Sequence, residues 1–404
     1  MTPTITKPAA TKLAFKNPAS MIVAGIMSGT SADGVDVAVT RISPGDDRPR
    51  LTLLAHEGYP FAPALRRAIL FAMNAQSIST AELARLNWRL GIAYAEAVTA
   101  TLQKHPRKLD LIGCHGQTMY HQAEKRLYAG RRFACTWQLG EAAVLASETR
   151  TPVVSNFRPA DMLAGGEGAP LVPLLDYTLF AHKHRARVLQ NIGGIANFTA
   201  IPASAGPEAL IAFDSGPGNM ILDALAQQLF HRTFDLNGKI AARGKVLSPV
   251  LNVLLRHLFF RKSPPRTAGR EQFGREYTHR LLLLCRQHSP HPEDAMATAC
   301  ALTAYSIAAA FERFAYPAME RAPIDYIVSG GGAKNNTLMT MLADRLNPLG
   351  CKLLPSEAFG LPAEAKEAAA FALLAWHTWH HRPANLPAAT GASHPAILGQ
   401  VTYV

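Results

Sequence analysis

The sequence predicts an α/β protein with two lobes and a ligand-binding cleft between them. The chain has 404 residues, which is more than one hydrophobic core usually supports. Hydrophobic residues make up 48% of the sequence and charged residues 17%, so a large globular core is available. Buried-type strands end in glycine-rich turns at several well separated places, and open α/β sheets bind their ligands at the ends of such strands.

The distribution of the basic residues argues against a nucleic-acid partner. Lys and Arg number 41 against 29 Asp and Glu, which gives a net charge of +12. These basic residues fall in separate short clusters, and we find neither a basic helix nor the aromatic-glycine pattern of an RNA-binding sheet. A solvated basic surface that tolerates phosphate ligands is the interpretation that we prefer.

Cysteine usage and the N-terminus indicate the compartment. The five cysteines form no CxxC pair, which favours reduced thiols and a cytoplasmic location. Residues 1–20 contain no acid and no apolar run of signal-peptide length, so we interpret them as a disordered leader, with an organellar transit peptide as the alternative. The apolar segments elsewhere are too short to span a bilayer, and we expect no membrane partner.

The first ordered element is a β-hairpin with a polar tip. Residues 21–27 and 37–42 have the apolar pattern of strands, and residues 28–36 between them are polar or glycine. A P-loop or dinucleotide fingerprint would need a helix after the loop. The backbone N–H and hydroxyl groups of this tip could bind phosphate oxygens, and Asp36 could hold magnesium. An ordinary type I′ turn with Asp33 and Gly34 at its corner is the alternative.

Two helices and a third strand follow. Apolar residues at three- and four-residue spacing predict two helices within residues 63–103, joined near residues 77–80. Residues 109–114 form a strand that ends in His115, Gly116 and Gln117. Polar groups at the end of a buried strand indicate ligand contact, although a lone histidine is more often a core or capping residue.

A glycine-rich linker divides the chain. We expect a helix over residues 142–149, a strand over residues 152–155, and a hinge at residues 165–170. The predicted first lobe is residues 21–160 and the second is residues 161–404, with the last helix or tail returning to the first lobe. The linker could instead be a long surface loop, but loops of this length inside a compact domain are usually functional.

The second lobe contains the glycine turns that we consider most informative. A helix over residues 171–181 precedes a strand over residues 187–192, which ends in Gly193 and Gly194. A further strand over residues 210–213 ends in Asp214, and a Gly-Pro-Gly turn and a helix over residues 220–230 follow. This pattern indicates a phosphate site with an acid beside it. The alternative is two hairpin turns, with Asp214 only capping the helix.

The last third of the chain adds a triple glycine and an acid. After helices near residues 249–259 and over residues 295–313, the strand 326–329 runs into Gly330, Gly331 and Gly332, before a helix that begins near residue 336. Such a turn lets a flat ring lie against the backbone and exposes helix N–H groups to an anion. Glu367 lies in the first turn of a helix, where it could point into the cleft or simply favour the helix terminus.

The order of these motifs resembles the nucleotide cleft of the sugar kinase, heat-shock ATPase and actin superfamily, with its actin-like, ribonuclease H-like fold. One family is much more similar, that of 1,6-anhydro-N-acetylmuramic acid kinase. The segments that carry this resemblance are GIMSGTSADGVD at 25–36, CHGQT at 114–118, GEGAPLVP at 166–173, NIGGIAN at 191–197, FDSGPGN at 213–219, TAGRE at 267–271, SGGGAKN at 329–335, and the terminal TGA at 390–392 with LG at 398–399.

The resemblance implies an enzyme of peptidoglycan recycling. In that family ATP phosphorylates O6 of the anhydrosugar while water opens the 1,6-anhydro bridge, giving N-acetylmuramic acid 6-phosphate. Asp214 would be the base that activates the water, and Glu367 would help order the magnesium and the sugar. The implied cofactors are ATP and Mg²⁺, and the implied assembly is a homodimer.

The implied site residues fall into three groups. Nucleotide contacts are implied for Gly29, Thr30, Ser31, Ala32, Asp33, Gly34, Val35, Asp36, Asn191, Gly193, Gly194, Gly330, Gly331, Gly332 and Asn335. Sugar contacts are implied for His115, Gln117, Arg158, Gly218 and Asn219. Magnesium contacts are implied for Asp36, Asp214 and Glu367.

The chain departs from the family pattern at several positions. Ala160 replaces an arginine expected to face the lactyl carboxylate of the sugar, Glu167 replaces a glutamine, and Ala268 replaces Ser or Thr. A carboxylate left unpaired in a cleft is costly, so a levoglucosan-type anhydrosugar kinase is an alternative within the family. A non-catalytic nucleotide-binding regulator is the alternative from another class.

Overall fold

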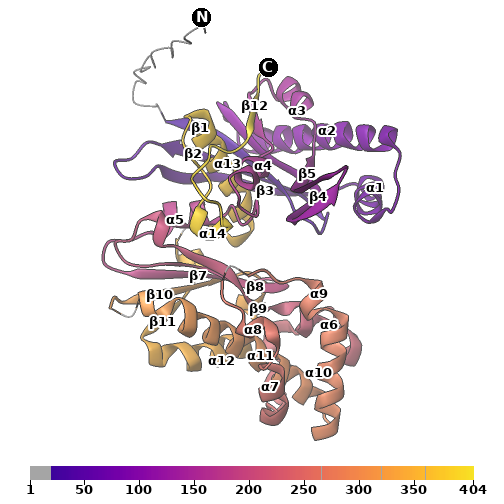
Figure 1. The fold of residues 1–404 in the computed structure, drawn as a ribbon, viewed down its shortest axis with the longest axis vertical. Helices are drawn as coiled ribbons and strands as arrows, with labels where there is room; N and C mark the ends of the chain where they lie inside the picture. Colours follow the sequence, from indigo (N-terminus) through magenta and orange to yellow (C-terminus); the bar gives the residue numbers. More distant parts are fainter. Residues whose placement is uncertain (1–19, 265, 320, 360) are drawn as a thin grey trace, which may run out of the picture.

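The computed structural model describes residues 20–404 except 265, 320 and 360, and it has two lobes, each built round one sheet (Figure 1). Of the leader predicted at residues 1–20, all but Ser20 lies outside the described residues. Within the described part of the chain, one sheet has seven strands in the order β12-β6-β4-β1-β2-β3 with β5 on β4, and the other has five in the order β11-β10-β7-β8-β9. The predicted two-lobed α/β fold is confirmed.

The sheet of the first lobe begins with an antiparallel meander. Its strands are β1 (Met21–Ser28), β2 (Gly34–Ser43) and β3 (Arg50–Pro60). Strand β4 (Leu111–Tyr128) runs parallel to β1 and to β6 (Val153–Ser155). The predicted hairpin is therefore present, but the type I′ alternative is wrong, because Gly34 already lies in β2 and the positive φ of 52° falls at Ala32.

Both faces of this sheet are covered by helices, because neighbouring strand residues point to opposite sides. Ala24 and Ile26 pack with α1 (Pro63–Asn74) and α2 (Thr80–Lys104), the two helices expected from the apolar spacing. Val23 packs on the other side with α13 (Lys366–Trp379). Helix α13 lies close to the sheet, because a Cβ on Gly25 would overlap the Ala368 carbonyl oxygen.

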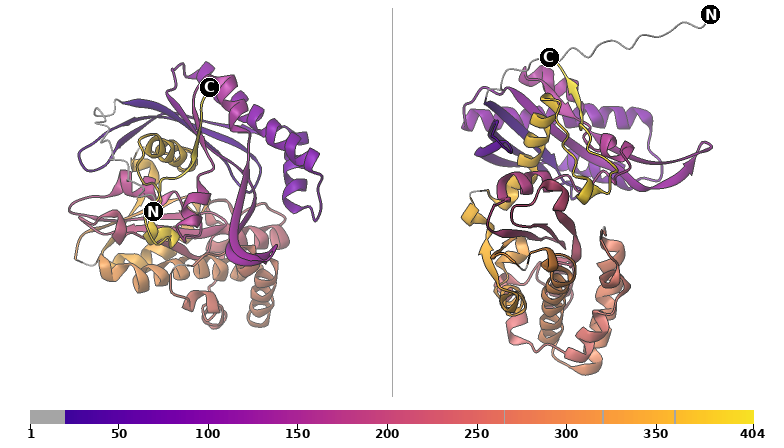
Figure 2. Two further views of the ribbon diagram at one scale, coloured as in Figure 1. Left: turned by 45° about the horizontal axis from the view of Figure 1, so that its top comes forward. Right: turned by 60° about the vertical axis from the view of Figure 1, so that its left-hand side comes forward.

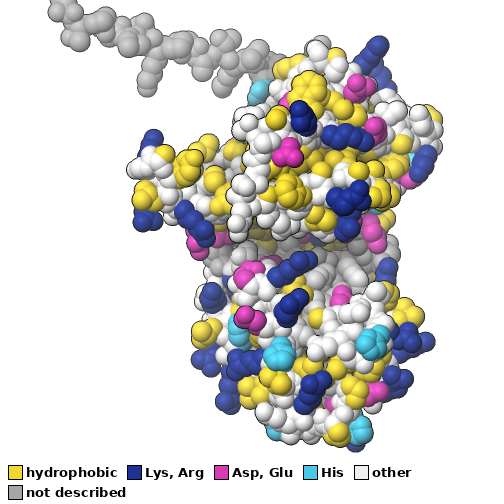
Figure 3. Space-filling model, turned by 90° about the vertical axis from the view of Figure 1, so that its right-hand side faces the viewer, with side chains coloured by type: hydrophobic (Ala, Val, Ile, Leu, Met, Phe, Trp, Pro, Cys, Tyr) yellow, Lys and Arg dark blue, Asp and Glu magenta, His cyan; other side chains and the backbone are white. Residues whose placement is uncertain are grey.

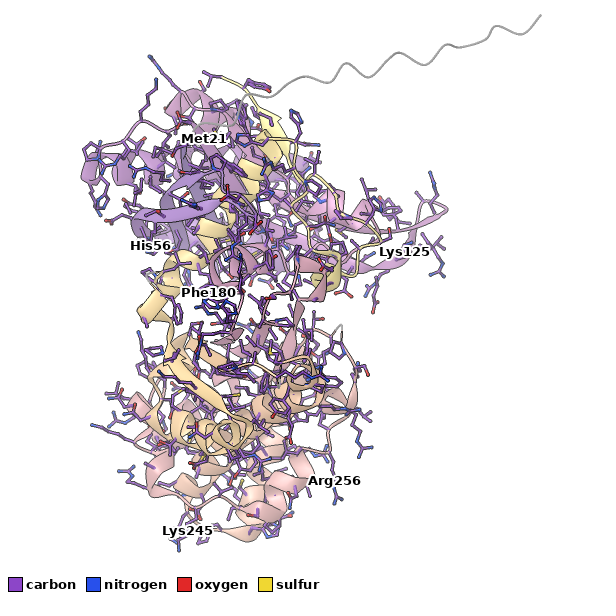
Figure 4. All side chains as sticks on the ribbon, turned by 90° about the vertical axis from the view of Figure 1, so that its left-hand side faces the viewer. Met21, His56, Lys125, Phe180, Lys245 and Arg256 are labelled. Carbon is purple, nitrogen blue, oxygen red and sulfur yellow. The ribbon has the colours of Figure 1, made fainter. Side chains whose placement is uncertain are left out.

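The end of the chain lies in the first lobe. Strand β12 (Gln400–Thr402) pairs antiparallel with β6, and α3 (Ala142–Thr149) matches the expected helix. The sequence did not indicate α4 (Arg158–Leu163) or the length of β4, which was expected to end at residue 114. Strand β4 instead continues with β5 (Arg131–Leu139) as a projecting ribbon, and Lys125 lies near its tip (Figure 4).

The second lobe is a mixed sheet covered by helices on its outer face. Strands β7 (Ala186–Ile192), β8 (Ile195–Ile201) and β9 (Ile211–Pro217) form an antiparallel meander, and β10 (Ile324–Ser329) and β11 (Cys351–Pro355) continue the sheet in parallel. The sequence does not indicate β8, and its pattern predicts an end of β9 at residue 213, whereas β9 continues to Pro217. Gly193 and Gly194 therefore do form a hairpin turn.

The helices of the second lobe supply its core. They are α6 (Asn219–Phe230), α7 (Ser248–Leu254), α8 (Leu258–Arg261), α9 (Arg270–Phe273), α10 (Arg275–His288), α11 (Pro292–Phe314) and α12 (Asn336–Leu346). Within the described residues, α11 is the helix long and apolar enough to cross a membrane, and it is mostly buried inside this lobe.

Helices α5 (Pro173–Phe180), α13 and α14 (Pro387–Thr390) lie between the two sheets (Figures 1 and 2). One apolar cluster contains residues of α5 and α13 together with Val23 of the first sheet and Leu189 of the second. Phe180 lies at the junction of the lobes (Figure 4). In the face shown in Figure 3, basic side chains are spread over both lobes rather than gathered in one patch.

Candidate active site

A cavity of about 580 Å³ lies between the lobes. Four of the residues predicted from the sequence line it together: Asp36 from β2, Asn191 from β7, Asp214 from β9 and Glu367 from α13. These residues are far apart in the chain. Carboxylates from both lobes thus face one space, which is what a reaction between two bound substrates requires.

Asp214 is held by the segment that follows α8. Its Oδ2 accepts a hydrogen bond from the Ala268 N–H at 2.7 Å, and its own N–H donates to the Arg266 carbonyl oxygen at 3.2 Å. Burial raises the pKa of Asp214 to about 6, although the Ala268 N–H and the charge of Arg266 oppose the rise. Asp214 does not cap α6, whose N-cap is Gly218, so the capping alternative is wrong.

Arg266 fixes the backbone on which Asp214 is carried. Its guanidinium is buried between the rings of Phe213, Phe259 and Phe314, with centroid distances of 4.8–5.3 Å. Nε donates to the Asp214 carbonyl oxygen at 3.0 Å, and Nη1 donates to the Lys262 carbonyl oxygen at 2.9 Å. Burial lowers the pKa of Arg266 to about 10, so it remains charged near neutral pH. The sequence analysis missed this residue.

Asp36 and Glu367 face the cavity from the first-lobe side. Asp36, near the N-terminal end of β2, has its Oδ1 3.2 Å from His56 Nε2. The protein surrounding Glu367 raises the pKa of its carboxyl, and the negative charge of Asp36 adds to this effect while Arg158 opposes it. Both carboxylates line the same cavity.

The half-buried Arg158 is hydrogen-bonded to the buried His115. Nε and Nη2 of Arg158 lie 3.0 and 2.8 Å from His115 Nε2, and Nη1 donates to the Gly168 carbonyl oxygen at 2.7 Å. Burial and the Arg158 charge hold the pKa of His115 well below its usual value, so the ring is neutral and accepts from Arg158. His115 also packs on Phe371, with ring centroids 4.6 Å apart.

The tip of the first hairpin is held by polar contacts. Gln117 accepts a hydrogen bond from Ser28 at 2.6 Å and donates to the Gly29 carbonyl oxygen at 3.0 Å, so its amide lies against the turn. Asp33 pairs with Arg66 at 2.9 Å and is exposed. Thr30, Ser31 and Val35 complete the loop and the start of β2.

The glycine turns of the second lobe lie against one another. Gly193 accepts a hydrogen bond from the Asn219 N–H at 2.7 Å, and Asn219 Nδ2 donates to the Ile192 carbonyl oxygen at 3.3 Å. Gly330 has φ of 85°, and a Cβ there would lie 2.6 Å from Asn191 Oδ1. A Cβ on Gly331 would lie 3.2 Å from Asn219 Nδ2, so the triple-glycine turn abuts the other glycine turn.

Several predicted residues lie outside the cavity lining. Asn335 is the N-cap of α12 and accepts from the Leu338 N–H at 3.0 Å. Gly218 packs so closely on the Gly193 carbonyl that a side chain would not fit. Gly194 and Gly332 shape the same turns, and Gly332 packs on Ile192. Sequence reasoning also missed the buried ion pair of Lys366 Nζ and Asp176 Oδ1, 2.7 Å apart, which lines the cavity.

The carboxylates of the cavity could hold magnesium only if substrate phosphate and water supply the other ligands. In the part of the chain that the structure describes, no three His, Cys, Asp or Glu side chains cluster tightly enough to hold a metal ion. Magnesium usually binds to one or two carboxylates and completes its shell with phosphate oxygens and water. Asp36, Asp214 and Glu367, which face the same cavity, fit that kind of site.

The two-lobed α/β fold and this cavity of carboxylates beside glycine turns define a phosphotransferase. The family model for Anhydro-N-acetylmuramic acid kinase matches residues 21–404. The chain is 42% identical over 386 residues to the Anhydro-N-acetylmuramic acid kinase of Bacillus cereus strain G9842, covering 95% of this chain and 99% of the relative. The protein of the same description from Bacillus thuringiensis strain Al Hakam is also 42% identical, over 95% of this chain and 98% of that relative.

The chain therefore belongs to the Anhydro-N-acetylmuramic acid kinase family, and it is an ATP-dependent sugar kinase. Among solved structures, an activator of the 2-hydroxyisocaproyl-CoA dehydratase from Clostridium difficile with bound ADPNP is similar, with a TM-score of 0.42 and 11% identity over 89% of this chain and 96% of that one.

Proposed function

We propose that the protein phosphorylates O6 of 1,6-anhydro-N-acetylmuramic acid with ATP while water opens the anhydro ring, giving N-acetylmuramic acid 6-phosphate and ADP in peptidoglycan recycling. The observation that carries this proposal is the meeting of Asp36, Asp214 and Glu367 in one interlobe cavity beside Asn191. Family membership supports the substrate and the use of ATP.

Asp214 would act as the general base. The carboxylate takes a proton from water, the water oxygen forms a bond to C1, and the bond between C1 and O6 breaks. O6 then takes the γ-phosphoryl group from ATP, and ADP leaves. A pKa of about 6 keeps Asp214 ionised at neutral pH while leaving it basic enough to accept the proton.

The other site residues would bind and orient the substrates. Asp36 and Glu367, with Asp214, would hold a magnesium ion, which neutralises phosphate charge when it is bound. The backbone of residues 29–35 and the turns at Gly193 and Gly331 would contact the nucleotide. The Arg158–His115 pair, which holds the loop of Glu167, Ala169 and Pro170, would lie on the sugar side. Gly218 and Asn219, which the resemblance also assigns to the sugar, lie against the Gly193 and Gly331 turns and would reach the sugar only from that side.

A levoglucosan-type substrate is the second candidate, and the departure from the family pattern at Ala160 supports it. Six acidic residues line the cavity: Asp36, Glu167, Asp176, Asp214, Glu364 and Glu367. The basic residues among the described lining are Arg266, which is bound to carbonyl oxygens, and Lys366, which is paired with Asp176. Ala160 packs against an apolar cluster where the family arginine would stand. Since magnesium and Lys366 would offset four of these acids, Glu167 and Glu364 are the acids that a sugar carboxylate would meet, and a sugar without a carboxylate would avoid them.

Two measurements test these proposals. ADP release with anhydro-N-acetylmuramic acid and levoglucosan, measured side by side, identifies the substrate, and turnover of neither by protein that binds ATP would exclude both. Asp214→Asn should lower kcat by about 10²- to 10⁴-fold, the usual contribution of a general base, while ATP binding is retained. Unchanged turnover in Asp214→Asn would mean that another residue is the general base. Absence of turnover in the wild-type protein would favour a non-catalytic nucleotide-binding regulator.

We further propose a cytoplasmic homodimer. The free cysteines, most of them buried, support a reducing compartment, and the resemblance to the family supports the dimer. Light scattering of the purified protein gives the molar mass, and the value for a single chain would contradict the dimer.

A further inference from the structure

The C-terminal strap, which we define as residues 385–393, lies against the glycine-rich loop of residues 164–170. Glu167, Ala169 and Pro170 of this loop line the active-site cavity, and so does Ala389 of the strap. We propose that the strap positions the sugar-side wall of the cavity through a buried hub of Asp161, Asn385 and Thr390. This inference rests on the proposed function, because we take the wall of Glu167, Ala169 and Pro170 as the sugar side on the ground that Arg158, a predicted sugar contact, binds the same loop at Gly168.

Asp161 is the centre of the hub, and it is fully buried. Its Oδ1 accepts hydrogen bonds from Asn385 Nδ2 at 2.8 Å and Thr390 Oγ1 at 2.7 Å, and its Oδ2 accepts from the Gly168 N–H at 2.8 Å. Buried carboxylates need such donors, since an unsatisfied one is costly. Two of the three donors come from the strap and the third from the loop, so the carboxylate ties the two segments together.

Main-chain contacts extend this connection along the loop. The Glu167 N–H donates to the Thr390 carbonyl oxygen at 2.8 Å, and the Ala164 carbonyl oxygen accepts from both the N–H and the hydroxyl of Ser393, at 2.8 and 2.7 Å. A side chain on Gly166 would overlap the Asp161 carboxylate, so the loop can approach Asp161 only with glycine there. The loop is thus held to the strap directly at Ala164 and Glu167, and through Asp161 at Gly168.

The opposite side of the loop is held by Arg158, whose Nη1 donates to the Gly168 carbonyl oxygen. The same guanidinium binds His115, the residue expected to contact the sugar. A loosened hub would therefore let the Glu167–Pro170 wall and the Arg158–His115 pair move together. The hairpin tip at Gly29 and the turn at Gly331 have their own contacts and would stay in place. The expected defect is in sugar binding rather than in nucleotide binding.

The test uses variants at Thr390 in the full chain. Thr390→Val keeps the shape but removes the donor, Thr390→Ser keeps the donor, and Thr101→Val is the control, since Thr101 is a fully buried hydroxyl of α2 remote from the cavity. We expect Thr390→Val to raise the sugar KM about tenfold, because the cavity wall is then no longer held where the sugar binds, and a tenfold change corresponds to about 1.4 kcal/mol of binding free energy. Binding of a non-hydrolysable ATP analogue should stay within about twofold, and Thr390→Ser and Thr101→Val should resemble the wild type.

Hydrogen exchange supplies a readout that needs no substrate. In Thr390→Val the amides of Glu167 and Gly168 should exchange faster, since their acceptors belong to the hub and the strap. Unchanged exchange would show that the hub does not hold the loop. Faster exchange with an unchanged sugar KM, or with an equal loss of ATP-analogue affinity, would overturn the positioning role. If Thr390→Val does not fold, the same measurements on Asn385→Leu, which removes the other side-chain donor to Asp161, decide by the same outcomes.

Failure of the proposed function has a different signature. A wild type that binds the ATP analogue but turns over neither anhydrosugar would exclude the kinase assignment and, with it, the sugar-side role of the wall. The exchange comparison would still decide whether the strap holds the loop.

Discussion

Asp214 is subject to two opposing effects on its carboxyl group. Burial disfavours the charged form, whereas the Ala268 N–H and the charge of Arg266 favour it, and the pKa is about 6 as a result. The carboxylate form, which can accept a proton, is therefore present above about pH 6. We expect kcat/KM to fall tenfold per pH unit below this value, measured between pH 5 and 8 in buffers of constant ionic strength. A flat profile through pH 6 would rule out Asp214 as the base.

Arg266 should contribute to turnover by holding the backbone of Asp214, in addition to its packing against the phenylalanine rings. Arg266→Met keeps a side chain between the three phenylalanine rings but removes the N–H groups that hold the Asp214 carbonyl. We expect kcat to fall by about tenfold or more with little change in ATP affinity, since a displaced base loses alignment. Arg313→Met is the matched control, because Arg313 also lies over Phe314 but is exposed. Equal kinetics of both variants would contradict this role.

Helix α13 is the element that brings Glu367 to the cavity. Its alanine-rich face allows close packing on the first sheet, and Gly25 and Gly113 supply strand positions without side chains where the helix backbone approaches. Glu367 lies in the first turn of this helix, so its position follows from how α13 sits on β1 and β4.

Gly25→Ala should therefore destabilise the protein strongly. The new methyl group would overlap the Ala368 carbonyl, and overpacking of this kind typically costs about 1–3 kcal/mol or more. Gly130→Ala is the control. Among the described residues, no atom lies within 4 Å of a Cβ at position 130. The substitution there is opposed only by the positive φ of 81°, which costs about 1–2 kcal/mol. Urea unfolding measures both, and a smaller loss at Gly25 than at Gly130 would contradict the packing argument.

At the scale of the whole molecule, α5 and α13 join the lobes. They share one apolar cluster with both sheets, and the ion pair of Lys366 with Asp176 connects them at the cavity. Asp176 is only 3% exposed and Lys366 18%, so the pair is largely shielded from solvent. Removal of one partner would leave a buried charge unpaired.

Lys366→Met should lower the free energy of unfolding by about 3–5 kcal/mol, the usual cost of breaking a buried pair. The double variant with Asp176→Leu should recover much of this loss, since no unpaired charge remains. Thermal and urea unfolding of the single and double variants completes the cycle. A double variant less stable than Lys366→Met would show that the pair is not the source of the effect.

The residues of the site were predictable where local pattern specifies them. The polar hairpin tip, Asp214 after a short strand, the triple glycine and Glu367 in a first helical turn all follow from residue types at fixed spacing. The order of the motifs along the chain is also sufficient to identify the family, without any knowledge of tertiary contacts. Strand β8 and the ribbon of β4 and β5 were missed, because their residues are stabilised by cross-strand pairing rather than by a strong local pattern.

The sequence by itself determined the class of the fold, the family and three of the acids that line the cavity, Asp36, Asp214 and Glu367, because these depend on residue identity and on order along the chain. Only the tertiary structure showed that Arg266 holds the backbone of Asp214, that Lys366 pairs with Asp176, and that Asp161 ties the C-terminal strap to the loop of residues 164–170. Each of these contacts joins residues that are distant in sequence, and the burial and geometry that give a polar pair its strength exist only after the chain has folded.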